Sequence, residues 1–117
     1  MSSQTTTTRL FRRPVSRAPG VRTAVETVLL AVADEIDAGR DVVPLSAVVL
    51  GAWLRDRDRF GMLDYKHAHP DTQRVLSELS RAVRRFGWVC RVGPRLYGLT
   101  DAGRRRVAEL KAERGRT

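Results

Sequence analysis

One stretch restricts the fold of this chain more than any other: a strand, a tight turn and a second strand that leads directly into a helix. The first strand is predicted over 88–92, where alternation places Trp88, Cys90 and Val92 on one side. The turn is predicted at 93–94, because glycine adopts the positive φ that the first position of a two-residue hairpin turn requires. The rest of the chain decides what this hairpin belongs to.

The hairpin is followed by the last predicted helix. The returning strand is predicted over 95–99, and Thr100 or Asp101 is predicted to cap a helix that begins at Ala102 and ends near Arg114. Apolar residues are few in this helix. It therefore either rests lightly on the domain or completes its apolar face against a partner.

Two helices and a short strand are predicted upstream. The clearest helix is predicted over 21–38, where apolar residues recur on one face and Gly39 follows as a stop signal. The β-branched run 41–44 predicts a short strand. A second helix is predicted from an N-cap at Ser46 to about Arg57, with a buried stripe of Val49, Leu50, Trp53 and Leu54.

A long connection precedes the third helix. Residues 58–71 exceed what a minimal helix-turn-helix needs, and their apolar side chains predict that this insert packs onto the domain; these are Phe60, Met62, Leu63 and Tyr65. Asp71 is the predicted cap of the third helix, and Gly87 is predicted to end it. Its predicted apolar face consists of Val75, Leu76, Leu79, Val83 and Phe86.

The positive charge of the chain is unevenly distributed. The formal net charge is +9, and arginine supplies nearly all of the bases. Residues 1–22 carry five arginines and no acid, residues 23–73 are net acidic, and residues 74–106 carry nine arginines against two acids. The last block coincides with the third predicted helix and the hairpin, which indicates a surface for a polyanion rather than ordinary solvated charge.

Length and composition bound the class of protein. A chain of 117 residues with 42% hydrophobic residues predicts one domain, over 20–117, preceded by a polar basic arm over 1–19. The arm is predicted either to lie in a minor groove or to be a solvated tail. No apolar run is long enough for a membrane span, and a single cysteine suits a reducing cytoplasm.

Catalytic and metal chemistry find little support in the sequence. Phosphate-binding glycine loops are absent, and no arrangement of serine, histidine and acid stands out. His67 and His69 lie in the insert, but their spacing is unlike that of structural zinc sites, and Cys90 reads as a small buried apolar residue. We therefore expect a protein that is not an enzyme and that uses neither a cofactor nor a metal.

The hairpin and last helix also resemble a known family. The segment RLYGLTDAGRRRVAEL is similar to the wing-exit signature of bacterial winged-helix regulators of the MarR and PadR kind, with Tyr97, Leu99, Thr100 and Gly103 at the matching positions. The resemblance implies a winged helix-turn-helix: a mainly α fold with a three-helix core, a two-stranded wing and an extra C-terminal helix. The long insert and the short wing depart from the family pattern.

The resemblance also implies roles for individual residues. The third helix would read bases in the major groove, and the candidates are Thr72, Gln73, Arg74, Ser77 and Arg81. The wing and its surroundings would contact phosphates, and the candidates are Arg84, Arg85, Arg91, Arg95, Arg104, Arg105 and Arg106. The N-terminal arm contributes Arg9, Arg12, Arg13 and Arg17.

The sequence thus predicts a cytoplasmic protein that binds double-stranded DNA sequence-specifically and regulates transcription, with a homodimer left open. Two other functions remain compatible with the same residues. One is a winged-helix adaptor that binds a protein partner in a larger assembly. The other is a nucleic-acid or nucleoid-binding protein without sequence preference, although few aromatic residues are available to stack on bases.

Overall fold

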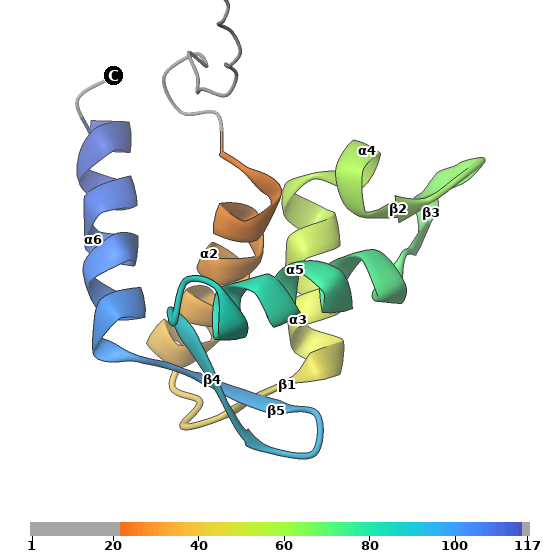
Figure 1. The fold of residues 1–117 in the computed structure, drawn as a ribbon. Coiled ribbons are helices and arrows are strands. Elements are labelled where there is room, and N and C mark those ends of the chain that lie inside the picture. Colours follow the sequence, from red (N-terminus) through yellow and green to blue (C-terminus); the bar gives the residue numbers. More distant parts are fainter. Residues whose placement is uncertain (1–21, 116–117) are drawn as a thin grey trace, which may run out of the picture.

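The computed structural model describes residues 22–115, and in this part of the chain the protein is mainly helical with a small antiparallel sheet (Figure 1). The predicted arm over 1–19 lies outside the described residues. The elements, in chain order, are α2 (Ala24–Asp37), β1 (Val43–Pro44), α3 (Leu45–Arg55), α4 (Arg57–Phe60), β2 (Gly61–Met62), β3 (Tyr65–Pro70), α5 (Thr72–Arg84), β4 (Val89–Gly93), β5 (Leu96–Leu99) and α6 (Asp101–Gly115).

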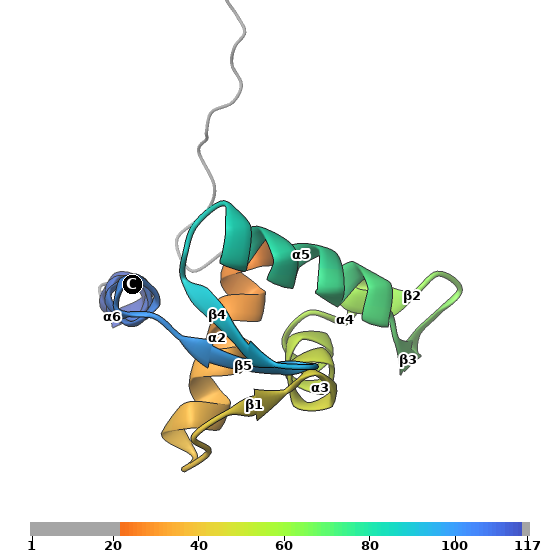
Figure 2. The ribbon, with the colours of Figure 1, turned by 60° about the horizontal axis from the view of Figure 1, so that its bottom comes forward.

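Two separate antiparallel sheets flank the helices. The larger has the strand order β1-β5-β4, so the hairpin β4–β5 is extended by the short strand that precedes α3. The smaller sheet is the hairpin β2–β3. Figures 1 and 2 show the two hairpins near opposite ends of α5, with β3 leading into the helix and β4 leaving it. The short strand predicted over 41–44 forms, but it is limited to Val43–Pro44.

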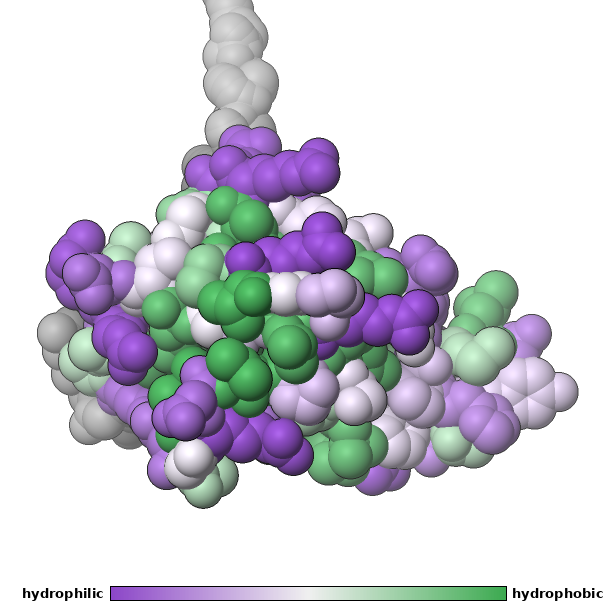
Figure 3. All heavy atoms as spheres, turned by 90° about the horizontal axis from the view of Figure 1, so that it is seen from below, coloured by the Kyte–Doolittle hydropathy of each residue, from purple (hydrophilic) through white to green (hydrophobic). Residues whose placement is uncertain are grey.

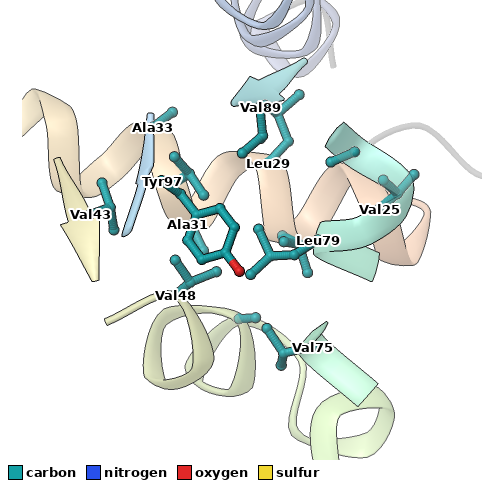
Figure 4. Close-up of a cluster of buried hydrophobic side chains, with 14 of the residues drawn as sticks. Val25, Leu29, Ala31, Ala33, Val43, Val48, Val75, Leu79, Val89 and Tyr97 are labelled. Carbon is teal, nitrogen blue, oxygen red and sulfur yellow. The ribbon is translucent and has the colours of Figure 1, made fainter. Parts of the chain in front are cut away.

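Helix α2 is the centre of the hydrophobic core. A capping box opens it: the amide of Glu26 donates to Thr23 Oγ1 at 3.2 Å, and the amide of Thr23 donates to Glu26 Oε1 at 3.0 Å. Gly39 follows its end with a φ of +108°, as the predicted stop signal requires. Its side chains pack against residues of α3, α5, β4 and β5 (Figure 4), which confirms the predicted apolar face.

Helix α3 differs from the prediction in its start and in its buried face. The helix begins at Leu45 and has no side-chain cap, so Ser46 is not the N-cap. The amide of Leu45 instead donates to the carbonyl of Arg95 at 2.9 Å, which ties the first turn to the β4–β5 turn. Of the predicted stripe only Val49 is fully buried, because the smaller side chains of Val48 and Ala52 lie against the core. Trp53 is half-buried, while Leu50 and Leu54 are about half exposed.

The insert folds into α4 and the hairpin β2–β3, and only part of it packs down. Phe60 is fully buried, as predicted. Met62, Leu63 and Tyr65 are 46%, 80% and 61% exposed, so the prediction that they pack onto the domain is wrong. The reason is the turn after Met62, which carries these side chains away from the helices.

Helix α5 begins as predicted. The side chain of Asp71 accepts a hydrogen bond from the amide of Arg74 at 3.1 Å. The helix ends at Arg84, and Gly87 follows with a φ of +64°. Phe86 therefore lies outside the helix and is 39% exposed, so it does not complete the apolar face.

The hairpin β4–β5 forms, but its buried side and its turn differ from the prediction. Val89 is buried, Cys90 is only half-buried and Val92 is 51% exposed, so the alternation has the opposite phase to the predicted one. The pairing register also shifts between Arg91 and Gly93. The turn consists of Pro94 and Arg95, and Arg95 rather than Gly93 has the positive φ, at 58°. Proline before a residue with positive φ is the pattern of a type II turn.

Three of the four residues in the motif that joins β5 to α6 have a structural role in this junction. Tyr97 is buried in the core, and Thr100 caps α6 by accepting a hydrogen bond from the amide of Gly103 at 3.0 Å. Gly103 lies directly against the backbone of Trp88. Helix α6 then rests on α2 through Val107 and Leu110, as the first of the two predicted alternatives expects.

Replacement of Gly103 by alanine is expected to destabilise the fold by about 2 kcal/mol, because the added methyl group would overlap backbone atoms that can move only if the strand and helix shift. A Cβ at this position would lie 1.9 Å from the carbonyl oxygen of Trp88. Urea denaturation measures the change in the free energy of unfolding. Gly98→Ala is the control, since its Cβ would make only ordinary contacts, with Cys90 Sγ at 3.4 Å and Val92 Cγ1 at 3.8 Å. Equal midpoints for the two variants would contradict the prediction.

Candidate nucleic-acid interface

The outer side of α5 forms a continuous exposed ridge. Gln73, Ser77, Ser80 and Arg84 lie at positions i, i+4, i+7 and i+11 and are all exposed. Their opposite side is anchored in the core by Val75, Leu79 and Ala82, which are at most 1% exposed. The ridge is therefore a row of polar side chains on a helix whose rotation is fixed by burial.

A groove of about 480 Å³ separates this ridge from the β4–β5 hairpin. Its lining combines α5, the start of α3 and both strands, and comprises Leu45, Thr72, Gln73, Leu76, Leu79, Ser80, Val83, Arg84, Arg91, Arg95 and Tyr97. Viewed from the side of the hairpin, long hydrophilic side chains surround apolar patches (Figure 3). Three arginines thus border a groove with an apolar floor, and we call this surface the α5 groove.

The arginines of the α5 groove come from separate elements. Arg84 ends the ridge of α5, Arg91 lies in the middle of β4, and Arg95 lies at the β4–β5 turn. All three are exposed, and the salt bridges found among the described residues do not include them. They are therefore the guanidinium groups of this face that are best able to meet an external anion.

Of the five candidate base-contacting residues, Gln73 and Ser77 lie on the ridge and Thr72 lines the α5 groove, while Arg74 and Arg81 lie beside the ridge. Arg74 and Arg81 flank Glu78, whose carboxylate is 3.4 Å from one guanidinium and 3.6 Å from the other. The Glu78 side chain is 6% exposed, whereas the arginines are 44% and 58% exposed. The structure therefore separates Arg74 and Arg81 from Gln73 and Ser77, and Glu78 offsets part of their charge.

Three further phosphate candidates are exposed but do not line the α5 groove. Arg85 follows α5, with its guanidinium carbon 5.9 Å from the ring centre of Phe86. Arg104 and Arg105 lie on the first turn of α6, beyond the end of β5. Arg9, Arg12, Arg13 and Arg17 of the predicted arm lie outside the described residues.

Arg106 occupies a different environment from its two neighbours. Its guanidinium contacts Glu26 at 2.7 Å, Glu109 at 2.8 Å and Glu113 at 3.7 Å. Burial alone would lower the pKa of Arg106, but the hydrogen bonds and charges of these three acids outweigh it and raise the pKa above its ordinary value. Arg106 therefore joins α6 to α2 and is not available to the same surface as Arg104 and Arg105.

Ser80 is the groove residue that the sequence reading missed. It lies seven residues after Gln73, which is two helical turns, and it lines the α5 groove. The helical spacing from Gln73 is a signal for Ser80 in the sequence, but a small uncharged residue does not stand out in a block of arginines. The apolar floor could not be anticipated, because Leu45 and Tyr97 come from elements far apart along the chain.

The residues considered for metal binding do not gather. Within residues 22–115, no group of three or more histidine, cysteine, aspartate or glutamate side chains is placed to hold a metal ion. His67 and His69 are exposed on β3, and Cys90 lies on β4 in the other sheet. In the same part of the chain, none of the helices combines the length and the apolar content that crossing a bilayer requires.

Comparison of the chain with protein-family models, with curated proteins and with solved structures gives no match. Its function must therefore be argued from its own residues.

Proposed function

We propose that this protein is a winged helix-turn-helix DNA-binding protein that acts in transcription regulation. The order of a helix (α2), a strand (β1), two helices (α3 and α5) and a hairpin (β4–β5), with α6 after it, supports this assignment. The elements α4, β2 and β3 are additions to that order. The observation that carries the proposal is the α5 groove. It brings the polar ridge of one helix and three arginines from separate elements onto one face.

A helix of this shape has the dimensions that the major groove of B-DNA admits. Gln73 and Ser77 lie on the exposed ridge and are the residues that would reach base edges, since a glutamine amide can pair with both polar groups of adenine. Arg84, Arg91 and Arg95 would contact phosphates on either side and fix the register. Arg74 and Arg81, tied to Glu78, are better placed for the adjacent backbone than for bases.

Duplex binding is expected to weaken steeply with salt. Six exposed arginines remain after Arg106 is removed from the candidates: Arg84, Arg85, Arg91, Arg95, Arg104 and Arg105. If about six phosphates are neutralised, the logarithm of the association constant falls with the logarithm of salt concentration at a slope of about −5. Fluorescence anisotropy with a labelled duplex, titrated between low and moderate salt, measures the slope. A flat dependence, or no binding at low salt, overturns the proposal.

Selection from a random pool of duplexes tests sequence specificity and dimerisation together. A recovered motif supports base reading by α5, and a palindromic motif supports a homodimer. Recovery of duplexes without any shared sequence would reduce the proposal to binding without sequence preference. Structured RNA added as a competitor distinguishes a preference for duplex DNA from general affinity for nucleic acid.

A protein–protein adaptor is the second candidate, and α3 is the observation that favours it. Leu50 and Leu54 lie one helical turn apart and are 50% and 56% exposed, so this helix presents apolar surface to solvent. An adaptor would bind its partner there without needing the arginines of the α5 groove. Insensitivity of partner binding to loss of those arginines would favour this function over DNA binding.

A further inference from the structure

The β2–β3 hairpin is fixed to the body of the protein at its base. Phe60, just before it, is fully buried, and the amide of Asp71, just after it, donates to the carbonyl of Phe60 at 2.7 Å. The indole N–H of Trp53 donates to the carbonyl of Lys66 at 2.6 Å. Gly61 leaves no room for a side chain, because a Cβ would lie 2.5 Å from the Cα of Lys66. The hairpin therefore leaves the helices at a set position.

The tip of the same hairpin is apolar and exposed. Leu63 is 80% exposed, the highest exposed fraction among the exposed large hydrophobic residues in the described part of the chain. Met62, just before it, is 46% exposed. Asp64 completes the turn with a φ of 72°. Figures 1 and 2 show the hairpin projecting past the N-terminal end of α5. Apolar side chains at the end of an anchored projection are unfavourable in water and indicate a surface that is covered on binding.

The surroundings of the tip favour a nucleic acid as the covering partner. Lys66, His67 and His69 follow on β3, and Asp64 is the hairpin's single acid. Tyr65 and His69 lie edge to face, with ring centres 5.9 Å apart, so their rings contact each other on β3. The chain then passes directly into Thr72 and Gln73 of the α5 groove. An element that continues beyond the start of a helix in the major groove reaches the neighbouring backbone and minor groove.

We propose that the β2–β3 hairpin is a wedge that enters the minor groove and bends the DNA. This inference rests on the proposed duplex binding. Leu63, backed by Met62, inserts between two base pairs, and Lys66 meets the flanking phosphates. Leucine and methionine are among the side chains that unstack base steps in this way, and the resulting kinks are about 20–90°. The α5 groove then fixes the position of the protein along the DNA, while the hairpin bends the DNA.

The test uses the full chain and a duplex of about 30 base pairs, well below the persistence length of DNA, labelled with a donor and an acceptor at its ends. The wild-type protein is expected to raise energy transfer on binding, because a bend brings the ends together. Leu63→Ala is expected to lose most of that rise while anisotropy still reports binding within roughly tenfold, since unstacking and insertion largely offset each other. The matched control is Leu54→Ala, which removes another exposed leucine side chain, on α3 and away from the hairpin.

The outcomes separate the wedge from the proposed function. Binding without a rise in energy transfer, or equal bending by wild type and Leu63→Ala, overturns the wedge and leaves duplex binding intact. Absence of binding at low salt overturns both. A change in mass on sedimentation with Leu63→Ala, without a change in bending, shows that the tip contacts a second copy instead and also overturns the wedge. Because Leu63 is 80% exposed, circular dichroism melting of the variant is expected to match wild type.

Discussion

Arg106→Ala is expected to lower the free energy of unfolding by about 2 kcal/mol, because it removes a charge-assisted hydrogen bond to a buried carboxylate. The partner is Glu26, whose side chain is 6% exposed and whose Oε2 lies 2.7 Å from the guanidinium. Arg105→Ala, on the neighbouring exposed position, is the control and is expected to change stability by less than about 0.5 kcal/mol. Guanidinium denaturation followed by circular dichroism measures both.

A second variant keeps this prediction separate from a general loss of packing. Glu26→Gln removes the buried charge, so the double variant Glu26→Gln, Arg106→Ala is expected to lose less stability than the sum of the two single changes. Additive losses would mean that the contact carries no coupling. A loss below about 1 kcal/mol for Arg106→Ala would place this pair with ordinary surface ion pairs.

Arg106 also shows where sequence reasoning reaches its limit. Three consecutive arginines at 104–106 look equivalent in the sequence, and all three were predicted to contact phosphate. Helical geometry turns Arg106 toward α2, where Glu26 lies 80 residues earlier in the chain. A pairing over that separation depends on how two helices dock, and no local pattern encodes the docking.

Local rules did predict α2, α3, α5 and α6 and the strands β1, β4 and β5, but not α4, β2 or β3. Asp71 caps α5 and Thr100 caps α6, because a side-chain acceptor next to free amides is favourable in any context. The apolar residues of α2 likewise recur at helical spacing within one continuous segment, so the sequence of that segment alone predicts the helix. The resemblance at Tyr97 and Gly103 has an explanation in packing, since one residue is buried and the other lies against Trp88.

Faces were predicted less well than elements. In β4 the alternation begins with Val89 facing the core, so Val89 is buried where Cys90 and Val92 were predicted to be. In α3 the buried position went to Ala52 rather than to Leu54, because the space against α2 suits a small side chain. The residues of the hairpin β2–β3 were predicted to pack onto the domain. Their hydrophobic character alone does not show that a turn exposes them to solvent.

The candidate site was predicted as a helix and a hairpin but not as a groove. Gln73 and Ser77 are on the ridge where the sequence placed them, whereas Arg74 and Arg81 are beside it with Glu78. The difference follows from the burial of Glu78, which an amphipathic pattern would have assigned to solvent. Phosphate contacts within the α5 groove would consequently come from three arginines rather than from the whole basic block.

Simultaneous replacement of those three residues, Arg84, Arg91 and Arg95, by glutamine is expected to weaken duplex binding about 100-fold at moderate salt, taking roughly 1 kcal/mol for each exposed contact. The salt slope is expected to become less steep by about 3, one unit for each lost phosphate contact. Because none of the three takes part in the salt bridges of the described residues, thermal stability should remain close to that of wild type. Fluorescence anisotropy across a salt series measures affinity and slope together.

The matched control removes the same charge from another face. Arg40, Arg55 and Lys111 pair with Glu35, Asp34 and Asp37 of α2, and the residues of the α5 groove do not include them. Their replacement by glutamine changes the net charge of the chain by the same amount. If binding depended only on total charge, both triple variants would lose affinity equally, and the α5 groove would have no special role. A loss confined to the first variant locates the phosphate contacts between α5 and the β4–β5 hairpin.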